Sequence, residues 1–140
     1  MTDTPDDYLD HEINGDADLK EMVRSITDYD REHLDDPTLD MQIRAAKLRV
    51  KNEADSSKFY EDDGLSQALL YTTAILAKCA AENYSLDRWN LGDAQIEARY
   101  AGDSDQAQFA HWAEMAAEGI RSSEEASVQP TPEFTNTFIG

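Results

Sequence analysis

The 140-residue sequence is short of cysteine, of basic residues and of long apolar segments. Its single cysteine, Cys79, excludes an internal disulfide and a metal site built from cysteines, and its apolar helical surroundings predict a small buried side chain. The longest apolar stretch, residues 65–81, is interrupted by polar side chains, so no segment is expected to cross a membrane. The first ten residues have neither a basic nor an apolar region, and we expect no secretory signal.

Motifs that carry chemistry are also missing. The three histidines, His11, His33 and His111, lie far apart, and none has the spacing of a metalloprotease or di-iron site. There is no phosphate-binding loop, no GxSxG nucleophile motif and no dinucleotide fingerprint. Acidic pairs are so numerous that no spacing singles out the ligands of a cation. We therefore expect no enzyme activity, no catalytic or metal site and no cofactor.

The scarcity of basic residues leaves a large negative charge. Thirty acidic residues against twelve basic ones give a formal net charge of -18, which destabilises a compact fold in dilute buffer and is screened by salt. The acids are spread along the whole chain, which favours the acidic surface of a protein from a salt-loving host over a nucleic-acid mimic or a disordered acidic tail. Direct binding of DNA is not expected, because phosphate contacts need positive charge.

Apolar residues recur at helical spacing in four segments. The sequence therefore predicts a mainly α fold, a small bundle of about four helices over residues 19–26, 38–54, 65–84 and 104–123. Asp16 or Asp18 is expected to cap the first helix, and the second is expected to begin at Asp36 or Thr38. The third helix is apolar nearly all round, so it should be the core helix.

Between the last two helices, residues 91–100 have the alternation of a half-buried β-strand. Ala94, Ile96, Ala98 and Tyr100 alternate with polar residues. No second segment of similar alternation lies within hairpin reach, so we expect one short strand without a partner in its own chain. Unpaired backbone groups are costly, and a neighbouring copy of the protein, or an extended segment from one, is expected to complete the ladder.

The residues from 126 to 140 are predicted to form an extended C-terminal tail. Two prolines and four hydroxylated residues follow no regular period, yet the segment carries spaced apolar residues: Val128, Phe134, Phe138 and Ile139. Extended segments with apolar anchors dock onto other proteins by strand addition or pocket insertion. Docking onto a partner is therefore predicted, with a disordered tail as the alternative. The expected organisation is a flexible acidic N-terminus (1–15), a helical domain (16–125) and this tail (126–140).

Five of the twelve basic residues lie between Arg44 and Lys58. Arg44, Lys47 and Lys51 recur at helical spacing beside the apolar stripe of the second predicted helix. Such a row is either a solvated helix face or an electrostatic interface that meets an acidic surface of a neighbouring subunit or faces passing DNA.

The order of a helix, a broad apolar helix, a glycine-led strand ending in tyrosine and a helix with tryptophan resembles the head-to-tail adaptor proteins of tailed viruses. These are also called head–tail connector or head-completion proteins. The segments that carry the resemblance are ALLYTTAILAKCAAENY (68–84), LGDAQIEARY (91–100) and FAHWAEMAAEGI (109–120). Gly92, Asp93, Ile96 and Tyr100 match the family's strand pattern. The acidic N-terminal region departs from the usual pattern and points to a virus of a halophilic, archaeal host.

The resemblance implies a structural virion protein that is made in the host cytoplasm and placed at the neck of the capsid vertex. Members of the family form rings, commonly dodecameric, beneath the portal protein and join it to tail or neck completion proteins. DNA would pass through the channel without specific binding, since an acidic lumen repels it. The implied subunit-interface residues are Gly92, Ile96, Ala98 and Tyr100, and the implied docking anchors are Val128, Phe134, Phe138 and Ile139.

A second function remains open from the composition alone. A small acidic helical protein of a halophile could act as an interaction or regulatory module, for example as an inhibitor that mimics nucleic acid. Such a protein would compete with DNA for a basic enzyme, whereas an adaptor would bind the portal.

Overall fold

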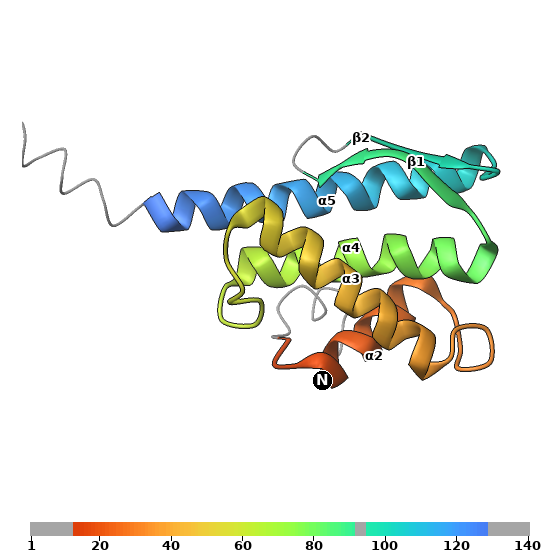
Figure 1. Ribbon diagram of the computed structural model, residues 1–140, viewed down its shortest axis with the longest axis horizontal. Helices are drawn as coiled ribbons and strands as arrows, with labels where there is room; N and C mark the ends of the chain where they lie inside the picture. Colours follow the sequence, from red (N-terminus) through yellow and green to blue (C-terminus); the bar gives the residue numbers. More distant parts are fainter. Residues whose placement is uncertain (1–12, 92–94, 129–140) are drawn as a thin grey trace, which may run out of the picture.

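The computed structural model describes residues 13–91 and 95–128 (Figure 1). These residues form four helices and two strands, in the order α2 (Asp16–Thr27), α3 (Asp36–Ala54), α4 (Asp63–Glu82), β1 (Ser85–Asn90), β2 (Gln95–Arg99) and α5 (Asp103–Val128). The mainly helical fold, with a β element between the last two helices, is confirmed. None of the described helices is long and apolar enough to cross a membrane.

Helix α4 lies at the centre of the bundle and packs against α2, α3 and α5. Twelve of its residues are buried, from Gly64 to Cys79, because the helix is apolar over most of its circumference. Figure 1 shows α4 and α5 running side by side, with α3 crossing in front of them and the hairpin lying along α5. The predicted core helix is therefore the core helix of the fold.

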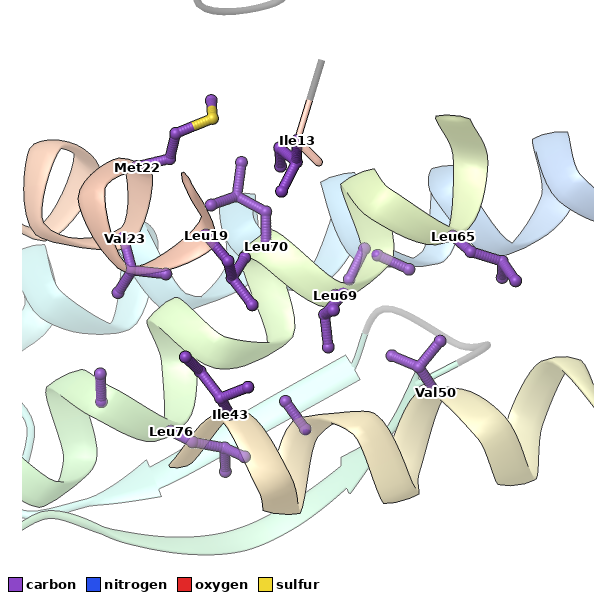
Figure 2. Packing of buried hydrophobic residues seen from close by; sticks show 14 of the residues in the cluster. Ile13, Leu19, Met22, Val23, Ile43, Val50, Leu65, Leu69, Leu70 and Leu76 are labelled. Atoms are coloured by element: carbon purple, nitrogen blue, oxygen red, sulfur yellow. The ribbon is translucent and has the colours of Figure 1, made fainter. Parts of the chain in front are cut away.

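The largest buried cluster joins α2, α3 and α4. Figure 2 shows Leu19 and Val23 of α2 and Ile43 of α3 converging on α4 near Leu69. A second cluster brings α4 together with α5 and β2 around Phe109, whose side chain is fully buried. Burial of these apolar surfaces is the main favourable contribution to folding.

Helices α4 and α5 approach each other most closely at two glycines. A Cβ atom added to Gly64 would lie 2.5 Å from the carbonyl oxygen of Gly119, and one added to Gly119 would lie 2.5 Å from the carbonyl oxygen of Gly64. Both positions therefore require the absence of a side chain. Glycine lowers helix propensity, but at this crossing it permits backbone-to-backbone packing.

The helix starts agree with the sequence only in part. Helix α3 begins at Asp36, as expected, and the carboxylate of Asp35 accepts a hydrogen bond from the Thr38 amide at 2.9 Å. The expected cap of α2 is wrong: Gly15 occupies that position and makes no side-chain cap hydrogen bond. Asp16 is instead the first residue of the helix.

The expectation of a strand without a partner in its own chain is wrong. Strand β1 pairs with β2 as an antiparallel hairpin, with Leu86 opposite Ala98 and Trp89 opposite Ile96. A register shift between Leu86 and Arg88 inserts one extra residue, Asp87, so the two half-buried residues of β1 are three positions apart instead of two. This bulge hides the alternation by which a strand is recognised in a sequence.

Helix α5 is longer than the predicted segment 104–123. It runs from Asp103 to Val128, so the first three residues of the expected extended tail, residues 126–128, are helical. The rest of that tail, with Phe134, Phe138 and Ile139, lies outside the described residues, as does Gly92.

Candidate interaction surfaces

The two edges of the hairpin differ. On the β2 side, the side-chain amide of Gln106 in α5 donates to the Ala98 carbonyl at 2.5 Å, and its oxygen lies 3.5 Å from the Ala98 amide nitrogen. The amide therefore occupies the place of a neighbouring strand at this point of β2. Covering an edge in this way protects it from pairing with another chain.

From Ser85 to Trp89, the β1 edge has no such cover in the described part of the chain. The described sheet has two strands, so β1 is paired with β2 on one side and with no described strand on the other. The side chains of Ser85, Asp87 and Arg88 are exposed, whereas Leu86 and Trp89 point partly into the core. The hairpin thus presents one closed edge and one open edge.

The strand residues that the sequence assigns to a subunit interface lie in different surroundings. The Ala98 side chain is 2% exposed and Ile96 is half-buried, and both belong to the cluster around Phe109 within one chain. Tyr100 is 77% exposed and has a left-handed backbone with φ of 75°. Among these three residues, Tyr100 alone offers a largely exposed side chain to a partner.

The basic row on α3 is divided between two environments. The ammonium of Lys47 lies 2.9 Å from the Asp16 carboxylate and near the rings of Phe59 and Tyr60, so it ties α3 to α2 and to the following loop. Arg44 and Lys51 are exposed, and their side chains have no ion pair with any described residue. Lys47 is thus a structural cation, whereas Arg44 and Lys51 face solvent.

A second structural cation holds α4 to α5. The Lys78 side chain is 13% exposed, and its ammonium lies 2.9 Å from the Asp105 carboxylate. The ammonium also lies 6.0 Å from the ring centroid of Phe109 and 5.9 Å from that of Trp112. Tyr84 donates a hydrogen bond to the same carboxylate at 2.5 Å. The Tyr84 hydrogen bond and the Lys78 charge lower the pKa of Asp105, and the same hydrogen bond raises the pKa of Tyr84 to about 12.

The corresponding cluster at α2 has the same composition. Tyr60 and Lys47 both donate hydrogen bonds to Asp16. Burial opposes the charge on Asp16, but the two donors outweigh it and lower the pKa of this carboxyl group. In each tyrosine–aspartate–lysine cluster the three side chains are paired with one another and hold neighbouring elements of the fold together.

The single cysteine and the acids at the start of α4 lie in different surroundings. Burial raises the pKa of the Cys79 thiol to about 11, which keeps it protonated and unreactive. A hollow of about 400 Å³ lies at the start of α4, lined partly by Glu61, Asp62 and Asp63. Asp62 caps α4 and accepts a hydrogen bond from Ser123, and no group of described side chains has the arrangement of a metal site.

Comparisons of the chain with models of protein families, with curated proteins and with solved structures find no match. The proposed function therefore rests on the surfaces described above and on the resemblance found in the sequence.

Proposed function

We propose that the protein is a head-to-tail adaptor of a tailed virus with a halophilic host, a structural virion protein. Copies would assemble into a ring beneath the portal, join it to the tail or neck proteins, and leave a channel for DNA. The proposal rests on the resemblance of three segments to this family and on one structural observation, the hairpin with a single open edge.

A one-sided hairpin suits the assembly of identical subunits. Because Gln106 covers β2, only β1 can accept a further strand, so each copy would accept one extended segment from one neighbour. The residues from 129 to 140 contain two prolines and three apolar anchors, a composition suited to an extended donor segment. An open edge on one subunit and a donor segment on the next form a head-to-tail contact, which closes into a ring when the rotation permits.

The charge of the chain also suits a DNA channel. With a net charge of -18, the subunit repels the duplex, so DNA can pass without being bound. The net charge separates this role from that of a protein that grips DNA.

The proposal can be tested by mixing the full chain with the portal protein from the same genome, at high salt, and measuring the mass of the complex by size-exclusion chromatography with light scattering. We expect a ring of copies bound to the portal. Replacing Phe134 and Phe138 by serine should abolish binding, whereas replacing Thr135 and Thr137 by alanine should preserve it.

Two results would contradict the proposal. One is the absence of any complex with the portal. The other is a monomer that displaces DNA from a basic enzyme, which would instead support the second function, an acidic inhibitor that mimics nucleic acid. Self-association of the isolated chain does not enter this test, because an adaptor can remain monomeric until it meets the portal.

A further inference from the structure

Half of the basic side chains form no ion pair with an acidic side chain among the described residues. The described residues include all twelve lysines and arginines, and six of these form ion pairs: Lys20, Arg24, Arg31, Lys47, Lys78 and Arg99. The acids outnumber the bases by thirty to twelve. Unpaired cations on so acidic a surface are therefore not explained by a lack of carboxylates.

Two of the unpaired cations lie on the outer face of α3. Met41, Arg44, Leu48 and Lys51 recur at spacings of three and four, on the side of the helix opposite to the buried Leu39, Ile43, Ala46 and Val50. We call these four residues the outer face of α3. These four residues carry two positive charges and no negative one, and Ala45 and Asn52 extend the face on one side. The acids next to it are Asp40, which pairs with Lys20, and Asp55, the C-cap of α3.

The outer face of α3 also holds most of the exposed large apolar side chains. Met41 is 63% exposed and Leu48 is 60% exposed, and Tyr100 is the one other large hydrophobic residue so exposed in the described ranges. Two apolar side chains with two cations beside them form a small centre with a charged rim, the usual layout of a protein–protein contact.

We propose that the outer face of α3 binds the acidic surface of a second copy of this chain. Charge complementarity carries the assignment, because the outer face is positive and the chain as a whole carries a charge of -18. Arg44 and Lys51 gain carboxylate partners, and Met41 and Leu48 lose their contact with water. The inference is independent of the viral role proposed above.

The charge of the outer face also limits what the face can pack against. Two copies of this face do not pack on each other, because their cations would be brought together. The outer face of one copy therefore meets a different, acidic surface of the next. This contact is made twice in a two-fold dimer and once per neighbouring pair in a ring or an open chain.

A nucleic acid is a poorer occupant of the same face. Its phosphates would meet two cations on a surface that otherwise repels them, and Met41 and Leu48 would stay in contact with water. A protein surface satisfies both the charges and the apolar side chains.

Sedimentation velocity of the full chain tests the proposal. In about 1 M KCl, where the Debye length is about 3 Å, the repulsion between copies is screened and contacts at close range remain. We expect the average mass to rise above the monomer value of 15.7 kDa as the protein concentration is raised to about 1 mM.

Two pairs of variants separate the outer face from net charge. Arg44→Glu with Lys51→Glu should weaken association at least about tenfold, which corresponds to 1.4 kcal/mol. Met41→Ser with Leu48→Ser should also weaken it without changing the charge. The matched control is Lys58→Glu with Arg121→Glu, which makes the same charge change at an exposed lysine and an exposed arginine outside both α3 and the hairpin, neither of them ion-paired with a described residue, and should associate as the original chain does.

Several outcomes would overturn the proposal. A chain that stays monomeric at about 1 mM has no such contact. An equal loss of association in the outer-face and control variants would show that net charge alone causes the effect. Binding of duplex DNA that is lost in the outer-face variants would assign the face to nucleic acid. None of these results bears on whether the chain binds a portal.

Discussion

At the scale of single residues, the shared carboxylate of Asp105 is the most informative group. It accepts a hydrogen bond from Tyr84 and pairs with the nearly buried Lys78, and both interactions lower its pKa below the ordinary value of 3.8. A carboxyl group whose pKa is lower in the folded state than in the unfolded state stabilises the fold above the unfolded pKa. This contribution is lost as the pH falls through the folded pKa.

Replacement of Asp105 by asparagine should therefore give a pH-dependent loss of stability. We expect the variant to be less stable than the original chain at pH 7, and we expect the difference to shrink as the pH falls below about 4. Urea unfolding at a series of pH values measures it. Glu114→Gln, at an exposed position of the same helix, is the control and should show a small and nearly constant difference. A difference for Asp105→Asn that does not change with pH would contradict the assignment.

At the scale of the elements, the crossing of α4 and α5 depends on Gly64 and Gly119. Alanine at position 119 would improve helix propensity by about 1 kcal/mol. Its Cβ atom would however lie 2.5 Å from a backbone oxygen that cannot move without separating the helices. Overpacking of this kind typically costs about 1–3 kcal/mol, so we expect a net loss of stability.

Thermal and urea unfolding of Gly119→Ala measure this loss. Gly102→Ala is the control for a methyl group added without a clash, because a Cβ atom there meets nothing within 4 Å. Gly102 directly precedes α5, where alanine is a poorer cap than glycine, so we expect the control to lose no more than about 1 kcal/mol. A Gly119→Ala variant that is as stable as the control would show that the helices can separate without loss.

The elements also show how far a single sequence determines this fold. The four helices follow from apolar residues that recur at helical spacing, and the broad apolar helix is α4. Strand β1 does not follow from the sequence, because the bulge at Asp87 places Leu86 and Trp89 three residues apart. The role of Gln106 is equally hidden, since it depends on where α5 lies against β2.

The surfaces were predictable only where charge and helical spacing decide them. The row of Arg44, Lys47 and Lys51 was visible in the sequence. The ion pair of Lys47 with Asp16 was not, because it depends on the packing of α2 against α3. The exposure of Met41 and Leu48 could have been found from the same helix, because both lie opposite its buried face. The sequence of one chain does not identify the partner that a surface binds, so the partner stays a proposal.

At the scale of the whole molecule, charge repulsion and ion pairing oppose each other. The net charge of -18 favours expansion of the chain, whereas the ion pairs of the fold are local and partly shielded from water. Salt screens long-range repulsion more than it weakens close, partly buried pairs. We therefore expect the midpoint of thermal unfolding to rise with KCl concentration.

Circular dichroism melting in a KCl series measures this dependence. The largest change is expected at low ionic strength, where the Debye length shortens from about 30 Å at 0.01 M to about 10 Å at 0.1 M. A series in sucrose serves as the control, since sucrose stabilises proteins without screening charge. A midpoint that falls with KCl would show that the ion pairs contribute more than the repulsion.

Three helices end on a residue in the left-handed backbone region: α2 on Asp28, α3 on Asp55 and α4 on Asn83. Glycine would adopt this conformation with less strain. An aspartate also places negative charge at the negative end of the helix dipole, an unfavourable interaction that salt weakens. In return, these residues leave the unfolded chain fewer conformations than glycine would. Salt thus weakens the unfavourable interaction at Asp28 and Asp55, so these two helix ends destabilise the fold most when the protein is desalted.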